Sequence, residues 1–144
     1  MRDHLEAAGP GAGIAFDFKA ITRRPNTLNA HRLMRWAQGQ DLGPACAEKL
    51  FRAYMEDGED IGHIDVLCRI AAEIGMDADL VRELMASDRD KTDTQNEILF
   101  FRQLGVSGVP TFIYQGQMAV QGAQEAEKHR SVLAEAAKLD PQTN

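Results

Sequence analysis

The stretch Gly105-Val106-Ser107-Gly108-Val109-Pro110-Thr111-Phe112 marks the point where the character of the chain changes. The segment before it has helical periodicity, whereas residues 111–114 are β-branched and aromatic, which favours a strand. Proline is tolerated at the first position of a strand because it need not donate to the ladder. The Val109–Pro110 bond is therefore either an ordinary trans bond at a strand entry or an X–Pro bond that tertiary context holds in cis.

Beyond this stretch the sequence predicts a hairpin and a last helix. Gln115-Gly116 is a suitable turn between residues 111–114 and a returning strand at 117–120. Gly122 ends that strand, and a helix is expected from about residue 124 to 139, with its apolar residues facing inward.

Before this stretch the chain is mostly helical. Apolar residues recur at i, i+3, i+4 and i+7, which indicates amphipathic helices. The helices are expected over residues 26–39, 43–57, 64–75, 77–85 and 90–104. Gly105 fits the position just after the last of them. Residues 2–8 could form a further helix, and 13–16 could be extended. The predicted fold class is therefore mostly α with a small β-hairpin (α+β).

The helical stripes also predict which residues form the core, because short amphipathic helices bury their apolar faces only against one another. The expected members are Leu50, Phe51, Tyr54, Leu67, Cys68, Leu84 and Met85.

Composition restricts the class of protein. The chain has 144 residues, of which 44% are hydrophobic and 26% charged, enough for one domain with its own core. A formal net charge of −6 argues against general binding of nucleic acid, which needs a basic face. No apolar run approaches the roughly 18 residues of a membrane span, and residues 1–6 lack the apolar region of a signal peptide. These features predict a soluble, cytoplasmic protein that binds neither nucleic acid nor membrane.

Cysteines and histidines give little support for a metal or cofactor site. Cys46 and Cys68 form no Cys-x-x-Cys motif, and in a reducing cytosol free thiols are expected, although a bridge between neighbouring helices is geometrically possible. Cys46 lies near a helix start, where the dipole would lower a thiol pKa, but a structural role is favoured for both cysteines. The four histidines have no helical ligand spacing, so we expect no metal and no cofactor.

Taken with the helix before it and the hairpin after it, the Val109–Pro110 stretch resembles the second half of a thioredoxin fold. The closest resemblance is to the DsbA family and, within it, to the cytoplasmic FrnE-like branch, over about residues 11–138. The further matching blocks are residues 14–16, 25–33, 50–54, 60–62 and 119–124. The resemblance implies an N-terminal segment at 1–19, a helical insert subdomain at 20–88 and the C-terminal half of a thioredoxin-like domain at 89–144.

The same resemblance implies a site at Val109, Pro110 and Thr111. In the family this proline is cis, it packs beside a redox-active Cys-x-x-Cys, and the backbone before it pairs with an extended substrate. Val109 and Pro110 are thus the expected contacts for an extended peptide or a thiol substrate. The family's first strand and its Cys-x-x-Cys have no counterpart in these residues, so the chain alone is expected to be inactive or nearly so.

Two other functions are compatible with these residues. Glutathione-dependent enzymes, namely 2-hydroxychromene-2-carboxylate isomerases and kappa-class transferases, share the helical insert and the Val-Pro loop. A non-catalytic binding or structural remnant would explain the missing motif. A homodimer through the strand at 111–115 is also expected, because an isolated hairpin is marginal in water and an open strand edge recruits another strand. The alternative is that residues 1–18 fold back and cover this edge.

Overall fold

The computed structural model describes residues 2–139 and divides the chain into two compact units, residues 1–96 and 97–144. Each unit is described by itself. The helix α6 (Lys91–Gln103) runs across the boundary between them. This boundary does not test the expected limits of the helical insert, residues 20–88, which stay a prediction.

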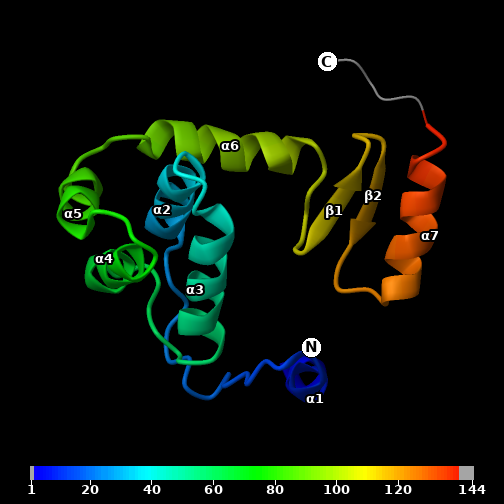
Figure 1. Ribbon diagram of the computed structural model, residues 1–144, viewed down its shortest axis with the longest axis horizontal. Helices are drawn as coiled ribbons and strands as arrows, with labels where there is room; N and C mark the ends of the chain where they lie inside the picture. The colour runs from blue at the N-terminus through cyan, green and yellow to red at the C-terminus, as the bar shows by residue number, and fades with distance from the viewer. Residues whose placement is uncertain (1, 140–144) are drawn as a thin grey trace. The chain divides into compact units, whose positions relative to one another are not determined.

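The first unit is helical (Figure 1). Its elements are α1 (Arg2–Ala8), the 3-10 turn η1 (Gly9–Ala12), α2 (Leu28–Gln38), α3 (Gly43–Met55), α4 (Ile64–Glu73) and α5 (Ala78–Ala86). Local signals account for several helix starts. Pro44 lies in the first turn of α3, where its missing N–H costs nothing. The Asp77 carboxylate caps α5 by accepting from the backbone N–H groups of Asp79 and Leu80.

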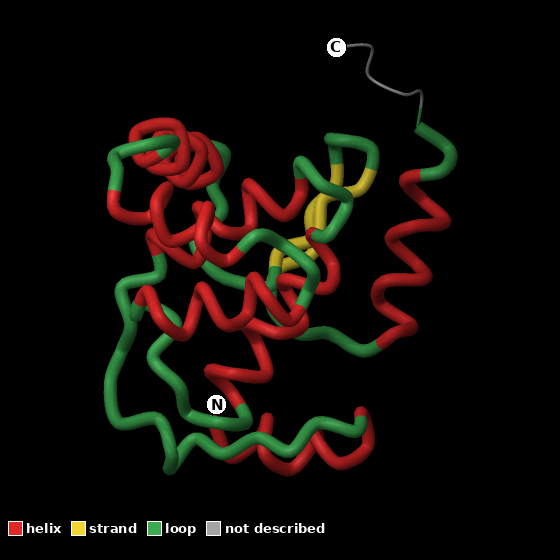
Figure 2. The backbone as a smooth tube through the Cα atoms, turned by 60° about the vertical axis from the view of Figure 1, so that its left-hand side comes forward, coloured by secondary structure: helices red, strands yellow, loops and turns green. Residues whose placement is uncertain are grey.

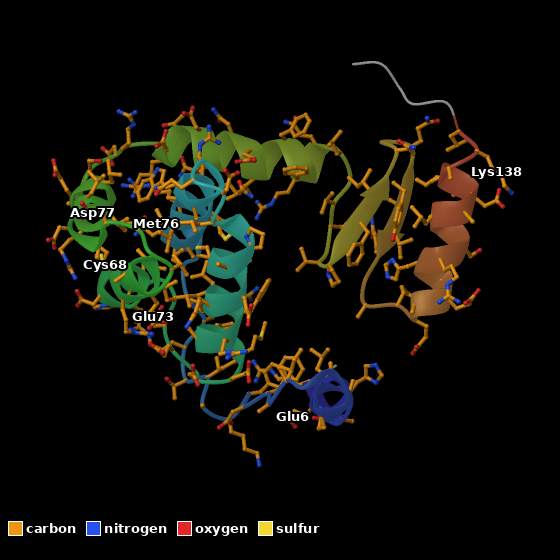
Figure 3. All side chains as sticks on the ribbon, viewed as in Figure 1. Glu6, Cys68, Glu73, Met76, Asp77 and Lys138 are labelled. Atoms are coloured by element: carbon orange, nitrogen blue, oxygen red, sulfur yellow. The ribbon has the colours of Figure 1, made fainter. Side chains whose placement is uncertain are left out.

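The core of the first unit is built by α2 to α5 around fully buried Leu33, Cys46 and Leu67. Cys68, labelled on α4 in Figure 3, belongs to the same cluster. Four of the predicted core residues are buried in it, namely Leu50, Leu67, Cys68 and Met85. Tyr54 packs against the cluster while partly buried, and Leu84 is half-buried.

The prediction for Phe51 is wrong, because its side chain is 65% exposed. The buried face of α3 consists of Gly43, Cys46, Leu50 and Ala53. Their spacing of three and four residues is helical, but the stripe is rotated toward small residues. Phe51 therefore lies on the flank of the helix, about 100° around the axis from Leu50.

A buried arginine joins α2 to the end of α5. Arg32 is fully buried, and its guanidinium donates to the carbonyl oxygens of Leu84 at 2.8 Å, Ser87 at 3.0 Å and Arg89 at 2.7 Å. Burial lowers its pKa although the charges of nearby aspartates oppose that shift, and an arginine remains protonated at ordinary pH. The cation thus satisfies the carbonyl groups of Ser87, at the end of α5, and of Arg89 in the loop that follows. It is a further donor to the carbonyl of Leu84, which also accepts from Ser87.

The second unit holds the end of α6, the hairpin of β1 (Thr111–Tyr114) and β2 (Met118–Gln121), and α7 (Ala126–Ala136). The strands are drawn in yellow in Figure 2, and they pair antiparallel with Phe112 opposite Val120. Gln115 and Gly116 both have positive φ, at 52° and 67°, as tight hairpin turns require. The small core of this unit is formed by Val120, Val132 and Ala136.

These elements confirm the predicted fold class. The structure is mostly helical with one small antiparallel hairpin among the described residues, and the expected helices and strands all form within a few residues of their predicted bounds. Residues 2–8 are helical, whereas residues 13–16 belong to neither a helix nor a strand.

Candidate functional site

The candidate site begins where α6 ends. Gly105 has a φ of 86°, and its N–H donates to the carbonyl oxygen of Arg102 at 3.0 Å. The N–H of Val106 reaches back to the carbonyl oxygen of Phe101 at 3.1 Å. This pair of bonds is the Schellman arrangement, which requires a left-handed residue and therefore favours glycine. The chain leaves the helix here and enters the loop that carries Val109 and Pro110.

The loop presents Val109 and fixes the residues around it. The Val109–Pro110 peptide bond is cis, and the Val109 side chain is 83% exposed. The hydroxyl of Thr111 donates to the carbonyl oxygen of Gly108 at 2.7 Å. The N–H of Gly122 donates to the carbonyl oxygen of Pro110 at 2.8 Å. The loop is thus tied to β2 on one side, and Val109 faces solvent within its unit.

The backbone of β1 has one paired edge and one open edge. In an antiparallel pair, the residues that hydrogen-bond to the partner strand alternate along the chain. Because Pro110 accepts from Gly122, Phe112 and Tyr114 also face β2, and Thr111 and Ile113 face the other way. No other described residue pairs with that second edge. The N–H and C=O groups of Thr111 and Ile113 are therefore available to another strand.

The two faces of the hairpin differ as well. Phe112 and Tyr114 face α7. The centroids of the Phe112 and His129 rings are 4.6 Å apart, and the two rings are packed edge to face. The Tyr114 hydroxyl lies 2.6 Å from His129 Nδ1. On the opposite face Ile113 is 48% exposed, and its cross-strand partner Ala119 is also exposed. The contacts with His129 anchor β1 on the α7 side, although Phe112 is still 42% exposed there. Ile113 and Ala119 have no such anchor and lie beside the open edge.

The two cysteines are buried and unreactive in character. Both are free thiols in the first unit. Burial raises the pKa of the Cys46 thiol to about 11, and burial is also the main reason that the pKa of Cys68 is raised. A thiolate is the nucleophile in cysteine chemistry, so the expected lowering of the Cys46 pKa by the helix start does not occur. Removal of the thiol from water is the cause of the raised pKa.

Two blocks that carried the resemblance meet in space. The N–H of Gly62 donates to the Asp60 carboxylate at 2.9 Å, and a Cβ added at Gly62 would lie 2.9 Å from the carbonyl oxygen of Asn26. The block at 60–62 therefore packs on the block at 25–33, and glycine is the residue that fits. The Asn26 side chain also accepts from the N–H of Leu28 at 3.1 Å at the start of α2.

Two kinds of feature are absent from the part of the chain that the structure describes. Among residues 2–139, no helix combines the length and the apolar character needed to cross a bilayer. Over the same residues, no group of three or more His, Cys, Asp or Glu side chains is placed to hold a metal ion.

Comparison with known proteins identifies relatives for nearly all of the chain. A family model described as a DSBA-like thioredoxin domain matches residues 1–134. The uncharacterized protein YwbO of Bacillus subtilis (strain 168) is 24% identical over 128 residues, which are 88% of this chain and 63% of that protein. The crystal structure of the probable DsbA oxidoreductase SCO1869 from Streptomyces coelicolor superposes with a TM-score of 0.86 at 26% identity, covering 99% of this chain and 61% of that one. The chain thus spans less than two thirds of the length of these two relatives.

Proposed function

Because the chain belongs to the family of DSBA-like thioredoxin domains, we propose that it supplies the substrate-binding part of a thiol–disulfide oxidoreductase. The observation that carries this proposal is the open edge of β1, which starts at the exposed Val109–Pro110 loop. Membership of the FrnE-like branch is part of the proposal, and the resemblance of residues 25–27 and 122–124 to that branch supports it. A cytoplasmic location is part of the same proposal.

The ligand of this surface is an extended polypeptide. A strand laid along β1 would exchange backbone hydrogen bonds with Thr111 and Ile113, whose polar groups face away from β2. Backbone pairing of this kind gives affinity with little dependence on sequence. The exposed Val109 side chain adds an apolar contact at one end of the strand. Ile113 adds a second apolar contact on the face away from α7.

Disulfide turnover is a separate matter from binding. Thiol–disulfide exchange needs a thiolate that attacks a disulfide sulfur. The 144 residues hold no Cys-x-x-Cys, and both thiols are buried with raised pKa values. We therefore expect this chain to bind an extended peptide without catalysing disulfide reduction by itself.

Binding is tested with carboxymethylated insulin B chain, an extended peptide whose thiols are blocked, by fluorescence anisotropy. Ile113→Pro removes an N–H from the open edge while leaving the bonds to β2 intact, because proline is tolerated on edge strands. Ile113→Thr is the matched control, since it retains the N–H and the β-branched shape. Saturable binding that is lost in I113P and kept in I113T supports the proposal, and equal binding by both variants contradicts it.

Turnover is tested by insulin reduction with dithiothreitol as the electron donor. The proposal expects the rate of the uncatalysed reaction, and turnover at the level of a complete family member would contradict it. Retention on glutathione resin that is lost in Val109→Pro would instead favour the glutathione-dependent function.

A further inference from the structure

A concavity of about 340 Å³ in the first unit has an unusual lining. It lies where the loop before α2 passes the last turn of α3. This loop, residues 13–27, is drawn in green in Figure 2. The lining residues are Arg2, Ile21, Thr22, Arg23, Arg24 and Tyr54.

The residues that line this concavity include three arginines and two residues with hydroxyl groups, and none of them carries a carboxylate. Arg2 is positioned by the ring of Phe18, with its guanidinium carbon 5.6 Å from the ring centroid. Arg23 and Arg24 are exposed, and within residues 2–139 neither has a hydrogen bond or an ion pair. The arrangement gathers positive charge without neutralising it.

Elsewhere the same chain pairs many of its cations. Its formal net charge is −6, so acidic partners are plentiful. Ion pairs join Lys49 to Glu73, Arg69 to Glu59, Arg82 to Asp65, Lys91 to Asp88, Arg130 to Glu127 and Lys138 to Glu135. Three arginines that converge on one concavity without a carboxylate stand apart from this pattern.

We propose that this concavity binds a small polyphosphate, an anion with two or more linked phosphate groups. Arginine presents a planar fork of donors that matches phosphate oxygens in pairs. A single exposed ion pair contributes little, so a ligand has to engage several of these cations at once. The hydroxyls of Thr22 and Tyr54 can donate to further phosphate oxygens. The volume lies at the lower end of the roughly 300–1,000 Å³ typical of ligand pockets, which suits a compact anion.

Isothermal titration calorimetry of the 144-residue chain with sodium pyrophosphate tests this proposal. The expected result is saturable binding by the wild-type chain and a loss of about tenfold or more in affinity in Arg23→Gln/Arg24→Gln, because two charge-assisted donors are removed. Both residues are exposed, and thermal unfolding of each variant checks that the fold is retained. The matched control is Arg130→Gln/Lys138→Gln, which removes the same charge from ion-paired residues of α7 or its end.

Three further titrations define the class of ligand. Citrate carries a similar charge on carboxylates, and it should bind more weakly than pyrophosphate. ADP tests whether a nucleoside on the diphosphate is accepted, and inorganic phosphate tests whether one phosphate is enough. The proposal is overturned if pyrophosphate gives no saturable heat, if the control variant loses as much affinity as the arginine variant, or if citrate binds as tightly as pyrophosphate.

Discussion

The guanidinium of Arg32 donates to the carbonyl oxygen of Leu84 at 2.8 Å, so a charged side chain of α2 binds the end of α5 from inside the core. The same group also bonds to the carbonyl oxygens of Ser87 and Arg89. A helix end leaves its last carbonyl groups without intrahelical donors, and here one buried cation serves several of them.

Removing this cation should destabilise the first unit strongly. In Arg32→Met the side chain keeps much of its length, but the carbonyl groups of Ser87 and Arg89 lose this donor. The carbonyl of Leu84 then accepts only from Ser87. We expect a loss of about 2–4 kcal/mol in the free energy of unfolding, measured by urea denaturation. Arg52→Met is the control, because its ion pairs with Glu48 and Glu56 are on the surface and such pairs contribute at most about 1 kcal/mol. Equal losses in the two variants would contradict the role of Arg32.

Two neighbouring residues of α3 should respond very differently to truncation. Leu50 is buried in the core and Phe51 is 65% exposed. Leu50→Ala is expected to cost about 2–5 kcal/mol, the range for a large-to-small change in a core. Phe51→Ala should change stability by about 0.5 kcal/mol or less, as is usual at surface positions. Urea denaturation of the two variants measures both changes in the free energy of unfolding. A large loss in F51A would mean that this ring is covered in solution.

Much of the fold could be predicted from the sequence because local signals act over a few residues. The Schellman end at Gly105, the turn at Gln115-Gly116 and the carboxylate cap at Asp77 each depend on residues within one or two turns of each other. Phe51 shows the limit of periodicity, which indicates that a helix has an apolar face without fixing its direction. That direction is set by the partner helices.

Arg32 and the arginine-lined concavity could not be predicted in this way. Apart from the Asn29 side chain, three positions away, the acceptors of Arg32 are backbone carbonyls more than fifty positions away in the chain. Every residue has such a carbonyl, so no side-chain pattern marks them. Arg2 reaches the same concavity as Arg23 and Arg24 only because the loop between α1 and α2 turns back. By contrast, the open edge of β1 was predictable, since one hairpin leaves one edge of its strand without a partner.

The Cys46 thiol should make stability depend on alkaline pH. Burial raises its pKa from about 8.5 in the unfolded chain to about 11 in the fold. The fold thus favours the protonated thiol, and this contribution is complete below about pH 8.5 and is lost as the pH rises through about 11. Urea midpoints should therefore fall between about pH 8 and about pH 10.5 more steeply in the wild-type chain than in Cys46→Ala. Equal dependence of the urea midpoint on pH in the two chains would contradict this. Because both chains contain all the other groups that titrate in this range, the difference between them reports on Cys46.

The open edge of β1 should also bring two copies of this chain together. Thr111 and Ile113 face away from β2, so a two-fold axis at Phe112 would place Thr111 of one copy opposite Ile113 of the other. That register exchanges backbone hydrogen bonds at both positions, as in a narrow antiparallel pair, and two-fold dimers are the commonest closed assembly. It also brings the exposed Ile113 side chains of the two copies onto the same face of the extended sheet.

Sedimentation velocity at micromolar concentration tests this dimer against a monomer of 15.9 kDa. We expect a dimer for the wild-type chain and for Ile113→Thr, and a monomer for Ile113→Pro, because the proline lacks the edge N–H. Carboxymethylated insulin B chain should dissociate the dimer, since the peptide and the second copy compete for the same backbone groups. A wild-type monomer would exclude the dimer, whereas a dimer that persists in I113P would show that another surface holds the two copies together.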